Sequence, residues 1–425
     1  MSNLTRRNFL KVSANSVAAL SVLGFASQSF AKEENQINVV IAGGGYGGST
    51  AAKYLKLLNP AINVTLIDRN VNHVSCAMSN EVIFGLRKIK EITKSLPNLA
   101  KKYGFNFVQA NVTSLDKENK ILKTSNGEFK YDKLLVSPGI DMDIDPNLNF
   151  SEEDIEKNIP HSWIAGKQTE TLMKLIKKVK KGDTMVLRTP KVPYRCPPGP
   201  YERACLFGEY AKKKGAKLIV LDPNPTIMSK KPLFEKAFNE LYKDVLEYVP
   251  NSVVTEITKD KVIKLEGGRE IKADLINYVH NNKAAKMAFD LGLVKEGEKW
   301  CAINPASFES LLAKDVYILG DAIDPKATDS PKSGTVANAI AKVVVENLIK
   351  EFNGKEPRVP IYGNTCYSLV SSNESIWIAT IYEYNAKANK ILVRNGANGI
   401  PKESSVENKL NGHGWAQNIL NDTFN

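Results

Sequence analysis

The sequence predicts an α/β protein built from two three-layer domains, with a smaller α+β domain at its C-terminal end. An apolar run at 37–42 leads through a glycine-rich turn into a helical stretch. A second set of short apolar strands, at 184–188 and 217–221, points to another parallel sheet. A late strand at 316–319, followed by a long apolar helix, matches the first unit rather than the second. The 425 residues suffice for two or three domains of roughly 100–200 residues each.

The first unit carries a dinucleotide-binding pattern. Gly43, Gly45 and Gly48 fit G-x-G-x-x-G directly after the strand, and Asp68 ends the next apolar run 20 residues beyond the last glycine. Such glycines allow a tight turn, close approach of the backbone to a pyrophosphate, and packing of helix on strand. The carboxylate accepts hydrogen bonds from ribose hydroxyls. The pattern predicts a Rossmann-like domain for FAD or NAD.

The late strand selects FAD. It ends in Gly320-Asp321, and a helix follows from about 334 to 348. In two-domain flavoproteins of the glutathione-reductase type, such an aspartate contacts the ribityl chain and the helix N-terminus faces the flavin. The alternative for Asp321 is an ordinary turn aspartate. We therefore expect a discontinuous FAD-binding domain, 37–149 and 286–358, with a second domain inserted at 150–285.

The inserted domain lacks the features of a nicotinamide site. Its first strand runs into Thr189–Pro200 (TPKVPYRCPPGP), where prolines replace the glycines that a phosphate turn needs. Proline has no N–H to offer a phosphate and cannot adopt a positive φ. The next strand still ends in an acid, Asp222. We predict an NAD(P)H-domain-like fold whose nicotinamide site is lost.

The N-terminus has the features of a targeting signal. Arg6 and Arg7 precede an apolar, small-residue stretch at 12–26 and a small-x-small end at 29–31. Residues 1–31 resemble a twin-arginine export signal, which predicts a periplasmic protein; an amphipathic N-terminal helix is the alternative. No later stretch approaches 18 uninterrupted apolar residues, so no membrane span is expected.

Charge distribution and residue spacing argue against nucleic-acid binding, a histidine metal site and covalently attached haem on this chain. The formal net charge is +12, but the lysines form scattered clusters without interleaved aromatic residues, so nucleic acid is not expected. The four histidines lack metal-ligand spacing, and no C-x-x-C-H haem attachment site occurs. The five cysteines leave at least one without an intramolecular partner in an oxidising compartment.

Several motifs resemble the flavoprotein subunit of flavocytochrome c sulfide dehydrogenase, in order along essentially the whole chain. They are 75–82 (SCAMSNEV), 196–204 (CPPGPYERA), 331–334 (PKSG), 364–368 (NTCYS) and 421–424 (NDTF). The resemblance implies that Cys196 and Cys366 form a redox-active disulfide over the flavin, although a structural disulfide is the alternative. It also implies that Cys76 bonds covalently to the flavin, whereas a lone cysteine is more often a small buried residue.

The resemblance assigns further roles. Glu202 would be the acid/base beside the disulfide, or alternatively a first-turn glutamate favoured by the helix dipole. Lys332 and Gly334 would join Gly320 and Asp321 in binding FAD. Haem would belong to a separate cytochrome subunit. Which cysteine takes the persulfide, and whether Cys205 and Cys301 pair, stays open.

The sequence thus predicts a periplasmic enzyme that oxidises sulfide, or a related sulfur compound, to sulfane sulfur or polysulfide and passes electrons singly to cytochrome c. Residues 359–425 would cap the flavin and contact the partner, with strands at 375–382 and 390–393; Trp415 would lie over the flavin or simply pack in the core. One alternative is a sulfide:quinone oxidoreductase, which would need an amphipathic C-terminal helix; 409–418 is rich in glycine and asparagine and predicts none. Another is a non-catalytic sulfur carrier or electron-transfer flavoprotein.

Overall fold

Five parallel strands form the first sheet of the computed structural model, which describes residues 36–145, 148 and 151–425. The predicted export signal, 1–31, lies outside the described residues. The strand order is β19-β9-β1-β2-β5. The bounds are β1 Asn38–Ala42, β2 Asn63–Asp68, β5 Asn106–Gln109, β9 Lys133–Val136 and β19 Val316–Ile318. Since β19 pairs with β9 (Val316 beside Leu134), two distant chain segments build one sheet, and the predicted discontinuous fold is confirmed.

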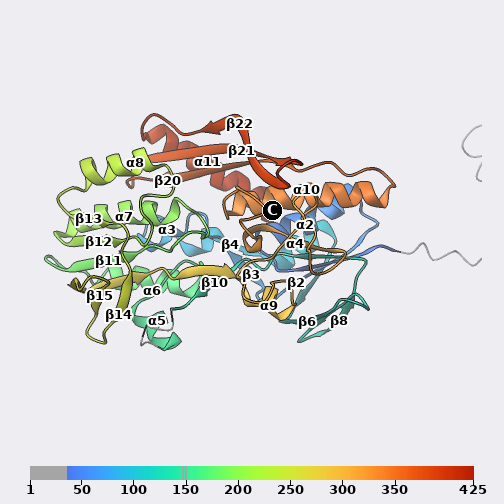
Figure 1. Cartoon of the computed structure of the whole chain (residues 1–425), viewed down its shortest axis with the longest axis horizontal. Coiled ribbons are helices and arrows are strands. Elements are labelled where there is room, and N and C mark those ends of the chain that lie inside the picture. Colours follow the sequence, from blue (N-terminus) through green and yellow to red (C-terminus); the bar gives the residue numbers. More distant parts are fainter. Residues whose placement is uncertain (1–35, 146–147, 149–150) are drawn as a thin grey trace, which may run out of the picture. The chain divides into compact units, whose positions relative to one another are not determined.

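Two long helices from the same two segments cover this sheet (Figure 1). Helix α2 (Tyr46–Leu58) follows the glycine turn, and α10 (Gly334–Phe352) packs against it. Ser333 caps α10, because its hydroxyl accepts from the Val336 N–H at 3.1 Å. The remaining elements of this part are short: β3 Asn72–Val74, α3 Ser79–Ile83, η1 Ile89–Ile92, β4 Thr93–Ser95, α4 Leu96–Tyr103, β6 Val112–Asp116, β7 Ile121–Thr124, β8 Gly127–Lys130, α9 Lys286–Asp290 and η3 Gly320–Ala322.

The inserted segment forms a second parallel sheet of order β13-β12-β11-β17. Its strands are β11 Thr184–Arg188, β12 Lys217–Leu221, β13 Leu246–Val249 and β17 Leu275–Tyr278. The helices are α5 Glu152–Asn158, α6 Lys167–Ile176, α7 Gly199–Lys214, α8 Lys231–Lys236 and η2 Ala237–Leu241, and β14 Val254–Ile257, β15 Val262–Leu265 and β16 Glu270–Lys272 form an antiparallel meander. The chain enters through β10 (Ile140–Asp143) and returns through β18 (Asn281–Ala284), which pair antiparallel.

The C-terminal part is an antiparallel sheet with one helix. Strands β20 (Ile361–Leu369), β21 (Ser375–Asn385) and β22 (Lys390–Gly399) pair in chain order. Helix α11 (Val406–Phe424) packs on β20, β21 and α2. The glycine- and asparagine-rich segment, from which no amphipathic membrane helix was predicted, forms most of this helix. The helix is stabilised by tertiary contacts, since Ile419, Leu420 and Phe424 are buried in one cluster with Tyr46 and Ala337.

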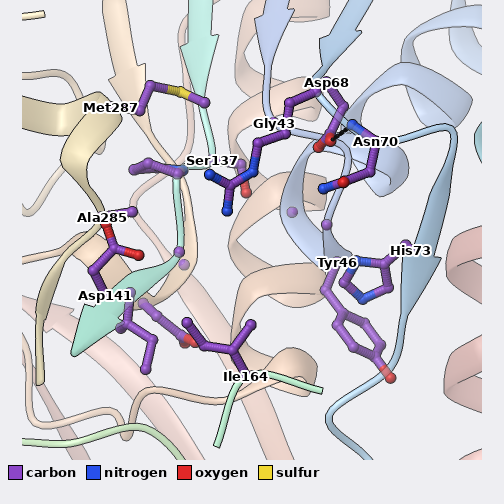
Figure 2. Close-up of a pocket in the computed structure, with 18 of the residues that line it drawn as sticks. Gly43, Tyr46, Asp68, Asn70, His73, Ser137, Asp141, Ile164, Ala285 and Met287 are labelled. Carbon is purple, nitrogen blue, oxygen red and sulfur yellow. Dashed lines mark hydrogen bonds between the residues drawn. The ribbon is translucent and has the colours of Figure 1, made fainter. Parts of the chain in front are cut away.

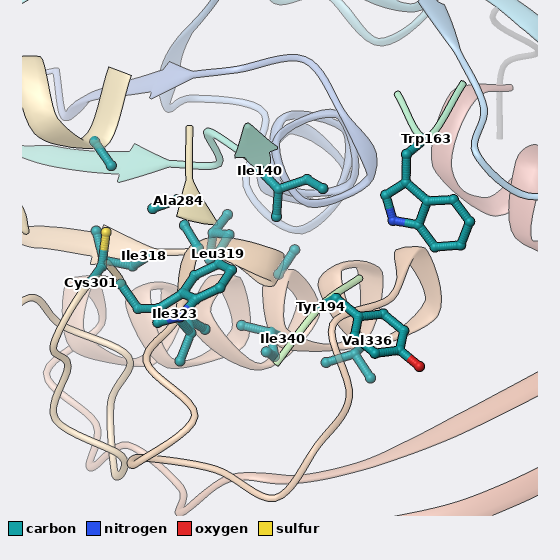
Figure 3. Packing of buried hydrophobic residues seen from close by; sticks show 14 of the residues in the cluster. Ile140, Trp163, Tyr194, Ala284, Cys301, Ile318, Leu319, Ile323, Val336 and Ile340 are labelled. Atoms are coloured by element: carbon teal, nitrogen blue, oxygen red, sulfur yellow. The ribbon is translucent and has the colours of Figure 1, made fainter. Parts of the chain in front are cut away.

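One large hydrophobic core joins the first sheet to the inserted part. It includes Ile318 of β19, Ile340 of α10 and Tyr194 of the proline-rich loop (Figure 3). This shared core packs the loop against the first sheet. Among the described residues, no helix has both the length and the apolar character of a membrane span. No group of three or more metal-ligating side chains gathers within that same part of the chain.

Candidate active site

A cavity of about 790 Å³ opens along the C-terminal edge of the first sheet. Figure 2 shows Gly43, Asp68 and His73 on its wall. Seven of the predicted cofactor residues line it: Gly43, Gly45, Asp68, Cys76, Gly320, Asp321 and Gly334. Its position, outside the carboxyl ends of parallel strands, is where such sheets bind nucleotides.

The glycines act as the motif predicts. Gly43 has φ +100°, and a Cβ there would lie 2.3 Å from the Ser137 carbonyl oxygen. A Cβ on Gly48 would lie 1.8 Å from the Gly43 carbonyl oxygen, so Gly48 serves helix–strand packing and does not line the cavity. Asp68 holds the turn, because its Oδ2 accepts from the Gly44 N–H at 2.6 Å.

Two buried polar atoms of the cavity wall have no partner among the described residues: Asp321 Oδ1 and His73 Nε2. Burial lowers the pKa of His73 to about 4, so its ring is neutral at physiological pH. Buried groups of this kind need hydrogen-bond partners. The hydroxyls and pyrophosphate of FAD provide such partners, so the site fits the cofactor that the sequence predicts.

Cys76 lines the same cavity. Burial raises the pKa of its thiol, and Arg195, which also lines the cavity, opposes this shift. The preceding residue is fixed, since Ser75 Oγ lies 2.6 Å from Tyr46 Oη.

Lys332 contacts the protein rather than the cavity. Its Nζ donates to the carbonyl oxygens of Asp321 (2.8 Å) and Ile323 (2.6 Å). Its own carbonyl oxygen accepts from the Cys196 N–H at 2.7 Å. Lys332 therefore ties the Gly-Asp turn to the cysteine loop, and it does not point into the space that a cofactor would occupy.

Cys196 and Cys366 are 170 residues apart in sequence but lie close together in the structure, next to the Cys196–Lys332 hydrogen bond. Cys196 precedes α7, and Cys366 lies on β20, which is anchored by the Thr335 hydroxyl donating to the Thr365 carbonyl at 3.2 Å. Both are free thiols in this structure, Cys366 Sγ donates to the Tyr367 carbonyl oxygen at 3.7 Å, and the two thiols lie close enough to interact with each other. This interaction raises the pKa of Cys196 and lowers the pKa of Cys366, so Cys196 keeps its proton.

Glu202 lies on the first turn of α7, next to the cysteine pair. Its Oε1 accepts from the Leu369 N–H at 2.8 Å, and its Oε2 accepts from Asn80 Nδ2 at 2.7 Å. Burial raises the pKa of this carboxyl group, and the two hydrogen bonds partly oppose the shift. A carboxyl group with a raised pKa next to two thiols is suited to exchange a proton with sulfur.

Sequence reasoning missed three polar residues around Glu202. Arg203 is 1% exposed and donates through Nε to Asn80 Oδ1 at 2.9 Å, which turns the Asn80 amide nitrogen towards Glu202. Lys230, 5% exposed, approaches from the start of α8 and donates to the Cys366 carbonyl oxygen at 3.1 Å. Asn80 and Arg203 lie within the motifs at 75–82 and 196–204 but carried no predicted role, and no motif marks Lys230; only the tertiary fold brings all three to the cysteines.

The end of α11 supports the cavity wall. Phe424 stacks on His73 with ring centroids 4.9 Å apart and meets Tyr46 edge-on at 5.3 Å. Asp422 fixes the helix end, accepting from Tyr54 Oη at 2.6 Å and Asn338 Nδ2 at 2.8 Å. Trp415 packs on Tyr367, the neighbour of Cys366, at 5.9 Å between ring centroids.

Asp222, the acidic residue after β12 of the inserted sheet, already accepts hydrogen bonds at both carboxylate oxygens. Asp222 Oδ2 accepts from Tyr201 Oη and Tyr248 Oη, each at 2.8 Å, while Oδ1 accepts from the backbone and side chain of Asn224. Neither oxygen is left for a ribose. Cys205 and Cys301 are buried free thiols on separate elements, and burial raises the pKa of Cys301 to about 12.

Comparison with known families covers most of the chain. Residues 37–168 match the pyridine nucleotide-disulphide oxidoreductases. Residues 169–280 match the central part of the sulfide dehydrogenase [flavocytochrome c] flavoprotein chain, and residues 358–424 match the flavin-binding part of flavocytochrome c sulphide dehydrogenase.

Two individual relatives show 25–30% sequence identity to this chain over part of its length. A sulfide-quinone reductase of Aquifex aeolicus is 25% identical over 356 residues, which is 77% of this chain and 80% of that protein. A type II NADH:quinone oxidoreductase of Staphylococcus aureus is 30% identical over only 108 residues, 25% of this chain and 27% of that protein.

Solved structures share the fold. The sulfide:quinone oxidoreductase of Aquifex aeolicus superposes with a TM-score of 0.70 at 19% identity, over 91% of this chain and 92% of that one. The covalent putidaredoxin reductase–putidaredoxin complex gives a TM-score of 0.65 at 15% identity, over 91% and 93%.

Proposed function

Because the chain belongs to the family of the flavocytochrome c sulfide dehydrogenase flavoprotein chain, we propose that it oxidises sulfide, or a closely related sulfur compound, to sulfane sulfur. The observation that carries the proposal is the pair Cys196 and Cys366 beside Glu202, next to Arg195 of the cavity wall.

In the oxidised protein these cysteines would form a disulfide. Hydrosulfide attacks one sulfur, a new S–S bond forms as the old one breaks, and one cysteine becomes a persulfide while the other leaves as a thiolate. Glu202, when ionised, takes the proton of the incoming sulfide. A bound FAD would supply the acceptor for the electron pair that the sulfur gives up. Cys76, on the wall of the same cavity, would hold this cofactor covalently.

The proposed acceptor is a cytochrome c, as a separate subunit or soluble protein that carries the haem and takes electrons one at a time. The proposed location is the periplasm, reached through the twin-arginine pathway; Arg6, Arg7 and the small-residue end at 29–31 support it. A quinone acceptor is the second candidate, favoured by the similarity to the Aquifex aeolicus sulfide-quinone reductase. Against it, the apolar residues Ile419, Leu420 and Phe424 at the end of α11 pack inside the protein, and only Val406 and Leu410 among the large apolar side chains of this described helix are exposed.

An anaerobic titration tests the function. Sulfide should bleach the oxidised-flavin absorbance band, and NADH should not, since the predicted loss of the nicotinamide site rests on the proline-rich loop and agrees with the occupied oxygens of Asp222. Cys196→Ser should abolish bleaching by sulfide while FAD stays bound. Bleaching by NADH, or an unaffected Cys196→Ser variant, would refute this mechanism. Adding cytochrome c or a short-chain quinone to the reduced protein then identifies the acceptor.

The covalent link has its own test. After acid denaturation, flavin fluorescence should stay with the wild-type polypeptide, whereas Cys76→Ala should release it. Free FAD from the wild type would exclude the bond.

A further inference from the structure

Lys230 is a buried lysine for which the described residues provide no carboxylate partner. Its Nζ donates to two neutral acceptors, the Cys366 carbonyl oxygen at 3.1 Å and Ser368 Oγ at 2.9 Å. Within the described ranges, no carboxylate oxygen lies at ion-pair distance from this ammonium group. The residue is also held at φ +50°, a conformation that is strained for a lysine.

A buried ammonium group without an anion is costly, because neutral acceptors replace only part of its hydration. Burial accordingly lowers the pKa of Lys230, while Cys366 on β20, Glu202 on α7 and Cys196 on the preceding loop act in the opposite direction. These are the titratable groups that face the ammonium, and Glu81 on α3 acts in turn on Glu202. The position is thus suited to a negative charge that arises during turnover.

We propose that Lys230 binds the anionic sulfur at Cys366: the incoming hydrosulfide, and then the charge that the exchange reaction leaves there. This inference rests on the proposed function and adds a substrate-binding residue to it. The site would accordingly select small anionic sulfur nucleophiles.

Either direction of attack places charge on the Cys366 side. If hydrosulfide attacks Cys366, the Cys366–Cys196 bond breaks, Cys196 leaves as a thiolate, and Cys366 carries a persulfide. Persulfides are stronger acids than thiols, and Glu202 takes the proton, so this group is an anion. If Cys196 is attacked, Cys366 itself leaves as the thiolate. The broken disulfide bond balances the new S–S bond in both cases, and this step needs no other oxidant.

Two measurements on the full-length flavoprotein test Lys230. In the chemically reduced protein, alkylation of Cys366 by iodoacetamide is followed by peptide mass spectrometry as a function of pH. Lys230→Met removes the cation, so the pKa of the Cys366 thiol should rise and half-maximal alkylation should move to higher pH. The second-order rate constant for flavin bleaching by sulfide should fall about ten- to a hundredfold, the usual loss of a hydrogen bond to a charged group.

The matched control is Lys231→Met, a change at the neighbouring exposed lysine, which pairs with Glu235 at 3.6 Å. It should behave as wild type, and Lys230→Arg should restore part of the rate. Unchanged alkylation and bleaching in Lys230→Met, or in Lys230→Gln if the methionine variant does not fold, would overturn the inference. If sulfide fails to bleach the wild-type flavin, the proposed function fails, whereas the alkylation profile still decides whether Lys230 stabilises an anion at Cys366.

Discussion

Arg203 shows how a buried charge can organise a site without touching the reacting atoms. Its guanidinium donates only to neutral oxygens, those of Asn80 and Asn277 and the carbonyls of His161 and Ser162. Burial lowers its pKa to about 9, so it stays charged at neutral pH. Since it occupies Asn80 Oδ1, only the amide nitrogen of Asn80 can face Glu202. Arg203 is therefore a positioning residue that acts through Asn80.

Asn80→Ala gives a prediction at this scale. Burial raises the pKa of Glu202, and the Asn80 amide opposes that shift by donating to the carboxylate. Without the donor, the pKa of Glu202 rises further, so the ionised base exists only at higher pH. The acid limb of the rate of flavin bleaching by sulfide should move to higher pH, and the rate near pH 6 should fall about tenfold.

A merely structural role of Asn80 would lower the rate without moving the pH profile. Asn119→Ala, at an asparagine on the exposed turn after β6, is the control and should leave the profile unchanged. An unshifted acid limb in Asn80→Ala would remove Asn80 from proton transfer.

At the scale of the elements, the backbone conformation of the loops around the cysteine site is the hardest feature to predict from the sequence. Met78, Cys196 and Lys230 all have positive φ although none is glycine. Met78 and Lys230 directly precede the short helices α3 and α8, and Cys196 precedes the turn into the longer helix α7. Such conformations persist only where surrounding contacts impose them. The sequence marks Cys196 through its motif, but nothing in the sequence predicts that Lys230 turns towards Cys366.

Helix α11 is a second example of a structure that the sequence pattern does not predict. Its glycines and asparagines have poor helix propensity, yet Ser405 caps it and Phe424 anchors it in the core. Tertiary packing overrides propensity here. The glycine motif and the late strand ending in Gly320-Asp321 were predictable because each depends on a local pattern, whereas α11 depends on a surface built by β20, β21 and α2.

Phe424→Ala tests this element. Phe424 is 4% exposed and stacks on His73 of the cavity wall. Its loss should lower the free energy of unfolding by about 3 kcal/mol and reduce the flavin-to-protein ratio of the purified protein. Denaturant unfolding and the absorbance ratio measure the two effects. Leu410→Ala, on the same helix at a side chain that is 64% exposed, should change neither. Equal stability of both variants would show that α11 does not support the cavity.

At the scale of the whole molecule, net charge bears on the choice of acceptor. The formal net charge is +12 for the whole sequence and +9 without the predicted export signal, which favours encounter with an acidic protein, and salt screens such attraction. Reoxidation of the sulfide-reduced protein by an acidic cytochrome c should slow about tenfold or more between 10 and 200 mM salt, roughly as for steered encounters. Reoxidation by a neutral short-chain quinone should not change. Salt-independent reoxidation by the cytochrome would mean that charge does not guide its docking.

The discontinuous sheet has a consequence for biosynthesis. Strand β9 pairs with β19, which follows it by more than 170 residues, and His73 of the cavity wall stacks on Phe424 near the end of the chain. Contacts of very large sequence separation therefore complete the cavity. Such contacts form late in folding. A ribosome-bound chain that has emerged only as far as α8 can fold the glycine turn but presents half a binding site. Flavin capture should therefore come after translation of nearly the whole described chain, and it would report that folding is finished.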